Sequence, residues 1–144
     1  YGRPLPFFQG VTDVVKGRVA LVGDAAGMVD ALSGEGIFYA LKGGTILAES
    51  LDRAFTENLG TLDPYRDRLE ETVFKELRWS ARLANVFFKF PKKCYEHGVK
   101  RPQVVEWIKR VVVSESSYDE IYGKIWDEIK SRVSSRALAT IGLG

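Results

Sequence analysis

Cysteine and histidine are almost absent from this chain of 144 residues, which has one of each, Cys94 and His97. A single cysteine excludes an internal disulfide, and one cysteine with one histidine cannot form a conventional zinc site. An excess of charge is also missing, because 21 basic residues face 19 acidic ones and leave a net charge of +2. We therefore expect no metal site and no nucleic-acid partner.

Long hydrophobic runs and a signal peptide are missing too. No stretch approaches the ~18 apolar residues of a membrane-spanning helix. We therefore expect a cytoplasmic protein, with peripheral contact to a membrane surface as the alternative. The chain begins at Tyr1 without a methionine, which suggests a segment of a longer polypeptide, although a processed terminus would look the same. What is present is enough for a core: 45% of the residues are hydrophobic and 12% are aromatic.

The first part of the chain, residues 1–58, has an α/β pattern. The apolar run 18–22 lies between Gly17 and Gly23 and predicts a buried strand of a parallel sheet. After a glycine-rich turn, the pattern over residues 36–55 predicts a helix. Its apolar residues recur at three- and four-residue spacing. They are Ile37, Ala40, Leu41, Gly44, Ala48, Leu51 and Phe55.

The second part, residues 59–144, is predicted to be all helical. A long helix should start after Asp63 and continue to the break at Phe90 and Pro91. Shorter helices should begin near Pro102 and at Ser117. The apolar face of the long helix is formed by Tyr65, Leu69, Val73, Leu77, Ala81, Ala84 and Phe88.

The segment between the predicted strand and helix contains the residues suited to ligand chemistry. Gly-Asp-Ala-Ala-Gly-Met starts at Gly23, and Leu-Ser-Gly-Glu-Gly-Ile ends at Ile37. An acidic residue directly after a strand lies where open α/β sheets bind ligands, and the Asp24 carboxylate can accept a hydrogen bond from a sugar hydroxyl. Gly34 and Gly36 lead into a helix N-terminus, whose free N–H groups suit a phosphate or a developing anion. The simpler alternative is that these glycines only turn the chain and pack the helix.

This segment resembles the second FAD-binding motif of a flavoprotein superfamily that includes aromatic hydroxylases. It is most similar to the geranylgeranyl reductase (digeranylgeranylglycerophospholipid reductase) family, because hydroxylases usually carry histidine where this chain has Gly27. The resemblance is strongest over residues 15–50. One difference is Asp30-Ala31, where the family commonly has proline before the leucine, and we expect this to loosen the turn.

The resemblance implies an FAD-dependent oxidoreductase that reduces isoprenoid double bonds of polyprenyl lipids by hydride transfer from reduced flavin. Asp24 would accept a hydrogen bond from a ribityl hydroxyl, and the glycine-rich turn into the helix would direct N–H groups at the flavin N1–C2=O edge. The cofactor-binding residues implied in this way are Gly23, Asp24, Ala25, Gly34, Glu35, Gly36 and Ile37. No catalytic residue or proton donor is identified.

The same resemblance also implies a missing part. Flavoproteins of this kind carry a Gly-x-Gly-x-x-Gly loop for the ADP half of FAD, and no such loop occurs here. We therefore interpret the chain as the C-terminal portion of a larger flavoprotein, with one half-site for FAD and the rest of that polypeptide as its partner. Two alternatives remain open. One is an electron-transfer flavoprotein of the quinone type or a flavin monooxygenase relative, and the other is a non-catalytic interaction domain without flavin.

Aromatic and basic residues alternate over residues 86–101. This stretch has four aromatic residues, five basic residues and one acidic residue. It could dock on an anionic membrane surface, as would suit an enzyme with a lipid substrate. We favour the alternative of a helix end whose phenylalanines belong to the core.

Overall fold

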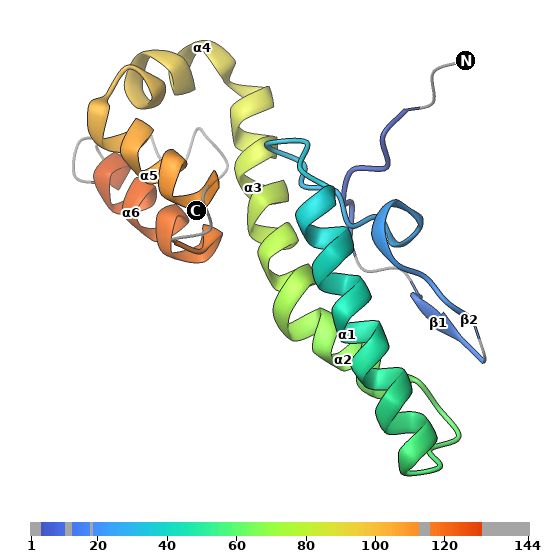
Figure 1. Ribbon diagram of the computed structural model, residues 1–144. Coiled ribbons are helices and arrows are strands. Elements are labelled where there is room, and N and C mark those ends of the chain that lie inside the picture. The colour runs from blue at the N-terminus through green and yellow to red at the C-terminus, as the bar shows by residue number, and fades with distance from the viewer. Residues whose placement is uncertain (1–3, 11–12, 18, 113–115, 131–144) are drawn as a thin grey trace. The chain divides into compact units, whose positions relative to one another are not determined.

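The computed structural model describes residues 4–10, 13–17, 19–112 and 116–130 (Figure 1). The chain divides into two compact units, Tyr1–Asn85 and Val86–Gly144. The predicted α/β front followed by a helical remainder is confirmed, because a short two-stranded sheet precedes the helices. The predicted domain boundary between residues 58 and 59 stays a prediction.

The strands of the first unit are short and antiparallel. β1 (Val15–Lys16) pairs with β2 (Val19–Ala20), with Val15 opposite Ala20 and Lys16 opposite Val19. The predicted buried strand of a parallel sheet over residues 18–22 is therefore wrong within the described part of the chain. The physical reason lies at Gly17, whose φ of +60° lets the chain reverse and pair with itself. Val19 is consequently 62% exposed rather than buried.

The predicted helix after the glycine-rich turn is confirmed as α1 (Ile37–Thr56). It buries Tyr39, Gly43, Ile46 and Ser50 against the rest of the first unit. Gly43 explains how close this packing is, because a Cβ there would lie 2.7 Å from Met28 Sδ.

The apolar residues predicted to face the core of α1 are mostly on its exposed side. Ile37 is 76% exposed and Phe55 79%, and Leu41 and Ala48 are exposed as well. The three- and four-residue spacing was correct, but it marks a second apolar face that the described residues do not cover. We call this face, made of Ile37, Leu41, Gly44, Ala48, Leu51 and Phe55, the α1 stripe.

The predicted long helix is confirmed with one irregularity. α2 (Asp63–Leu69) continues through a π turn, η2 (Glu70–Phe74), into α3 (Lys75–Lys89). An ion pair between Arg78 Nη1 and Glu70 Oε1 spans that turn, and Arg78 Nη2 donates to the Glu70 carbonyl at 3.4 Å.

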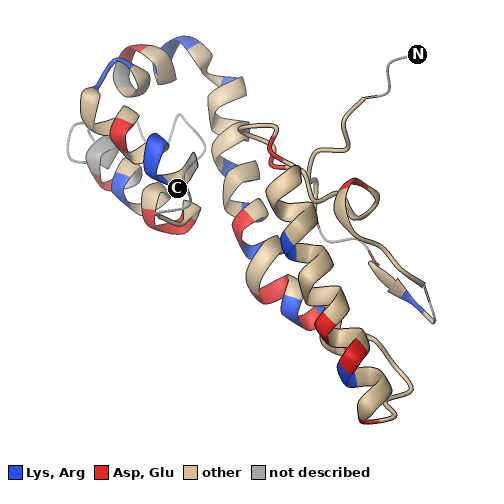
Figure 2. Ribbon diagram, in the orientation of Figure 1, with Lys and Arg blue, Asp and Glu red and all other residues tan. Residues whose placement is uncertain are grey.

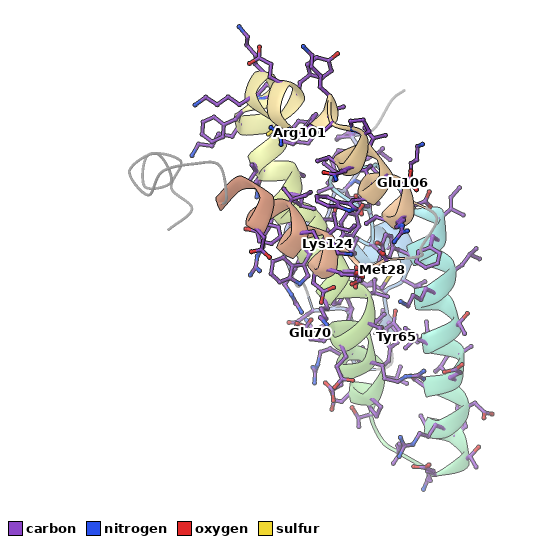
Figure 3. All side chains as sticks on the ribbon, turned by 90° about the vertical axis from the view of Figure 1, so that its left-hand side faces the viewer. Met28, Tyr65, Glu70, Arg101, Glu106 and Lys124 are labelled. Atoms are coloured by element: carbon purple, nitrogen blue, oxygen red, sulfur yellow. The ribbon has the colours of Figure 1, made fainter. Side chains whose placement is uncertain are left out.

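The core of the first unit lies where α1 packs on the α2–η2–α3 helix. Tyr65, Leu69, Val73 and Leu77 are fully buried, as predicted. Figure 3 shows Met28 and Tyr65 on this packed side, and the Tyr65 hydroxyl donates to the Leu21 carbonyl at 2.7 Å. The N-terminal segment joins the same core through Phe8, whose ring stacks on Phe74 at 5.6 Å. Helix packing rather than the small sheet therefore holds this unit together.

The second unit begins within α3 and continues, as far as the structure describes it, in short helices. They are α4 (Pro91–Cys94), a π turn η3 (Tyr95–Val99), α5 (Pro102–Val112) and α6 (Tyr118–Lys130). The helices expected near Pro102 and Ser117 are thus confirmed. None of the helices in the described residues is long and apolar enough to cross a membrane.

Candidate functional site

The Gly-Asp-Ala-Ala segment forms one tight turn, the 3₁₀ helix η1 (Gly23–Ala26). Gly23 has a φ of +62°, and a Cβ added there would lie 3.2 Å from Ala40 Cβ on α1. Gly27 closes the turn in the left-handed conformation, and its N–H donates to the Asp24 carbonyl at 3.0 Å. Glycine is therefore required at Gly23 both by backbone conformation and by the close approach of α1.

Asp24 is exposed beside the N-terminus of α1. Its carboxylate accepts no hydrogen bond from the part of the chain that the structure describes. A Cβ built at Gly36 would lie 3.5 Å from Asp24 Oδ1, so the structure brings these two predicted residues together. Ala25 is also exposed in the same turn. An acceptor carboxylate is thus available to a ligand at this point.

The loop from Asp30 to Gly36 delivers the chain into α1. Its backbone closes on itself, since the Asp30 N–H donates to the Glu35 carbonyl at 2.8 Å and the Gly34 N–H donates to the Asp30 carbonyl at 3.0 Å. Gly34 has a φ of +78°, a conformation that side chains other than glycine rarely adopt. The loop is therefore an ordered turn.

The first N–H groups of α1 differ in what they bind. Glu35 Oε1 accepts a hydrogen bond from the Phe38 N–H at 2.8 Å, and the Glu35 N–H donates to Ser33 Oγ at 3.2 Å. The N–H groups of Gly36 and Ile37 have no acceptor among the described residues. Two donors thus remain for a ligand, while the predicted contribution of the Glu35 N–H to flavin binding stays a prediction.

An apolar surface borders these donors. The side chains of Ile37, Phe38 and Leu41 are exposed on the first turns of α1. Lys42 Nζ lies 5.9 Å from the centre of the Phe38 ring and adds a cation beside them. The site therefore combines a carboxylate, two N–H donors and apolar side chains. The carboxylate can accept a hydrogen bond from a hydroxyl, and the N–H donors can stabilise a partial negative charge. The apolar side chains can shield a flat apolar group from water.

Asp30 and Ser80 are part of this site, and sequence reasoning missed both. Asp30 is 1% exposed, and its Oδ1 accepts hydrogen bonds from the Leu32 N–H and the Ser33 N–H, both at 2.8 Å. The expectation that Asp30-Ala31 loosens the turn is therefore wrong, because the carboxylate fastens it. Asp30 was visible as a difference from the family pattern, whereas no sequence signal pointed to Ser80, which lies 50 positions away.

Within the described part of the chain, other chemically reactive side chains form no second centre. Burial raises the pKa of the Cys94 thiol, which keeps it protonated and unreactive at neutral pH. No group of acidic, cysteine and histidine side chains that could hold a metal ion exists among the described residues.

The basic and aromatic stretch of the second unit is more exposed than we expected. Phe88 is 65% exposed, so the interpretation of the phenylalanines as core is wrong at Phe88, while Phe87 and Phe90 are half-buried. Tyr95 is exposed as well. Basic residues are close to them along the chain, as the blue segments around α4 show (Figure 2). Lys93 Nζ lies 5.7 Å from the Phe90 ring centre, and Lys100 Nζ lies 5.3 Å from that of Tyr95.

Comparison with known proteins finds relatives among reductases. The chain is 31% identical over 119 residues to the chloroplastic geranylgeranyl diphosphate reductase of Oryza sativa subsp. japonica, which covers 74% of this chain and 26% of that protein. It is 32% identical over 120 residues to the geranylgeranyl diphosphate reductase of Synechocystis sp., which covers 81% of this chain and 28% of that protein. A chloroplastic protein of the same name from Nicotiana tabacum is 57% identical over 77 residues, covering 50% of this chain and 17% of that protein.

These matches span about a quarter or less of the relatives' own length. No protein-family profile matches the chain, and no solved structure matches it. The chain is thus similar to part of proteins named geranylgeranyl diphosphate reductase.

Proposed function

We propose that this chain is the flavin-contacting C-terminal portion of an FAD-dependent reductase of the geranylgeranyl reductase family. The reaction would be reduction of isoprenoid carbon–carbon double bonds in polyprenyl lipids. The observation that carries the proposal is the convergence of the Asp24 turn and the α1 N-terminus, where Asp24 Oδ1 lies 3.5 Å from the Cβ position of Gly36. The similarity to reductases supports the same assignment.

The residues at this point suit FAD. The free Asp24 carboxylate would accept a hydrogen bond from a ribityl hydroxyl. The Gly36 and Ile37 N–H groups would face the ring edge that gains negative charge on reduction, and the positive end of the α1 dipole would favour that charge. Exposed Ile37 and Leu41 would keep water away from the ring. FAD, when bound, supplies the hydride, and the ADP-binding loop would come from elsewhere in the polypeptide.

The test uses the full-length protein and two exposed aspartates. Asp24→Ala should lower the FAD content after purification and raise the FAD Kd by about tenfold, because one charge-assisted hydrogen bond is lost. The control is Asp52→Ala on α1, an exposed residue with no side-chain bond in the described part of the chain. Circular dichroism should be unchanged in both variants. Equal FAD content in the two variants would refute the role of Asp24.

The alternatives predict other results. An electron-transfer flavoprotein or monooxygenase relative would also bind FAD, but the reduced flavin would deliver electrons to a quinone or to oxygen rather than to an alkene. A non-catalytic interaction domain would bind no FAD in the full-length protein. Single-turnover oxidation of the reduced protein by a polyprenyl alkene, by a quinone or by oxygen separates these three outcomes.

The rest of the polypeptide is the partner that we propose for the α1 stripe. A helix that is apolar on two faces is normally covered on both. The first face packs on Met28 and Tyr65. Most of the α1 stripe is exposed among the described residues, and nothing lies within 4 Å of the Cβ position of Gly44. The relatives are about four times as long as the matched segment. A polypeptide of that length has enough additional residues to cover the α1 stripe.

We also propose that the protein works in the cytoplasm and touches a membrane surface through residues 86–101. Exposed Phe88 and Tyr95 lie among Lys89, Lys92 and Lys93, a combination suited to anionic lipid headgroups. Such contact would bring the enzyme to a lipid substrate.

A further inference from the structure

Asp30 and Ser80 form a buried polar contact between the loop before α1 and helix α3. Asp30 is 1% exposed and Ser80 is fully buried. The Ser80 hydroxyl donates to Asp30 Oδ1 at 2.7 Å. Burial of a carboxylate costs free energy unless hydrogen bonds compensate for the lost hydration. The buried Asp30 carboxylate therefore depends on the donors around it.

The same carboxylate oxygen organises the loop. Asp30 Oδ1 accepts the N–H groups of Leu32 and Ser33, and Ser80 Oγ accepts the Leu32 N–H as well, at 3.3 Å. The backbone of Asp30 bonds at both ends to the residues that lead into α1, through the Glu35 carbonyl and the Gly34 N–H. The Asp30 side chain thus connects the start of the loop to Ser80 on α3. The Asp30 backbone connects the start of the loop to its end, at Gly34 and Glu35.

We propose that Asp30 and Ser80 are positioning residues, which hold loop 30–36 on α3 so that the Gly36 and Ile37 N–H groups lie where the flavin ring needs them. This inference rests on the proposed function. Gly36 and Ile37 end the loop, so a loop released from α3 would move both donors. Hydrogen-bond stabilisation of a developing charge depends on fixed donors, and displacements below 1 Å reduce it.

A matched control distinguishes positioning from stability. Ser50 on α1 is also buried, and its hydroxyl donates to the Ile46 carbonyl of its own helix at 2.7 Å. Ser80→Ala and Ser50→Ala each remove one buried hydroxyl from the same unit. Only Ser80→Ala removes a contact to the loop.

The experiment uses the FAD-loaded full-length protein and three measurements: the FAD Kd, the reduction potential of the bound flavin, and the urea midpoint of unfolding. Ser80→Ala should raise the FAD Kd by about tenfold, because loop 30–36 loses its contact with α3 and the Gly36 and Ile37 N–H groups are displaced from the flavin. The flavin potential should also fall, since displaced N–H groups stabilise the reduced ring less. Ser50→Ala should lower the urea midpoint about as much as Ser80→Ala does, but it should leave the FAD Kd and the flavin potential unchanged.

Two variants of Asp30 test the acceptor itself. Asp30→Asn keeps an oxygen that can accept the Leu32 and Ser33 N–H groups, so its FAD Kd should stay within about threefold of the parent, whereas Asp30→Ala should raise the Kd by tenfold or more. Equal Kd values for Ser80→Ala and Ser50→Ala, or for Asp30→Asn and Asp30→Ala, would overturn the positioning role while the proposed function stands. A parent protein that binds no FAD would overturn both.

Discussion

At the scale of single residues, two neighbouring glycines of α1 have opposite surroundings. A Cβ at Gly43 would lie 2.7 Å from Met28 Sδ and 3.3 Å from Val22 Cγ2, whereas nothing lies within 4 Å of the Cβ position of Gly44. Both Gly43→Ala and Gly44→Ala introduce the better helix former, which contributes roughly 0.5–1 kcal/mol to stability. At Gly43 the added Cβ also forces Met28 and Val22 to shift, so Gly43→Ala should leave the 144-residue chain less stable than Gly44→Ala does, by about 1–3 kcal/mol. Urea unfolding measures both, and equal changes in the free energy of unfolding would contradict this difference in packing.

Tyr65 gives the first unit a dependence on alkaline pH. Burial raises the pKa of Tyr65 to about 12 from its ordinary value of 10.0. The unfolded chain loses this proton above pH 10, while the folded chain keeps it until about 12. The stability that the neutral phenol contributes is therefore fully present below pH 10 and is lost as the pH rises toward 12.

Tyr65→Phe tests this dependence. The variant should lose about 1 kcal/mol at neutral pH, because the Leu21 carbonyl loses its donor, but it should be less sensitive to alkali than the parent. Urea midpoints followed from neutral pH through the alkaline range provide the measurement. Parallel curves for the two proteins would show that Tyr65 does not cause the alkaline loss.

At the scale of elements, the α1 stripe predicts how a charge placed on it acts. In the full-length protein, Ala48→Glu should lower the thermal midpoint by several degrees, because it buries an unpaired carboxylate under the polypeptide that we propose to cover the stripe. Thr56→Glu introduces the same side chain at an exposed position about 100° around the helix from Phe55 and serves as the control. Scanning fluorimetry measures both, and equal midpoints would indicate that the stripe is uncovered.

The helices could be predicted from the sequence because their evidence is local. Proline at the start of α2 and the four-residue spacing from Tyr65 to Leu77 both lie within the element that they predict. The direction in which a helix faces is not local. The inward side of α1 is the one that contacts Met28 and Val22, which lie outside the helix. The spacing within α1 does not contain this information, so it predicts the α1 stripe as core although most of the stripe is exposed.

The candidate site shows the same division. The Asp24 turn and the Gly34-Glu35-Gly36 turn carry glycines whose spacing is visible in the sequence, and the structure brings Asp24 and Gly36 together. Ser80 could not be predicted, because it is an ordinary helical serine until the fold places it against Asp30. The same holds for the strands, because the chain reverses at Gly17 and β1 pairs with β2 in an antiparallel way instead of forming the predicted parallel strand.

At the scale of the whole molecule, the surface of residues 86–101 predicts binding to anionic vesicles. Lys92→Ala with Lys93→Ala should weaken binding to phosphatidylserine-containing vesicles by roughly thirtyfold, since each basic residue near such a surface contributes about 1 kcal/mol. Phe88→Ala should weaken it further, whereas Phe7→Ala, which truncates an exposed phenylalanine of the first unit outside the α1 stripe, should have no effect. Co-sedimentation of the full-length protein provides the measurement. Equal loss on Phe88→Ala and Phe7→Ala would refute a specific role for this surface.

The π turn between α2 and α3 has a consequence for how this helix tolerates changes in length. Residues four apart drift around an α-helix by about 40° at each step, so a row such as Tyr65, Leu69 and Val73 gradually turns away from its neighbour. A π turn accommodates one extra residue, so each of its residues rotates less around the helix axis than a residue of an α-helix does. This smaller rotation offsets the drift and keeps Leu77 on the buried side. Deleting exposed Glu71 should therefore yield a regular helix whose later residues keep their direction. The same deletion at Arg82 would rotate everything after it by about 100°. Insertions and deletions among homologous chains should accordingly concentrate at residues 70–74.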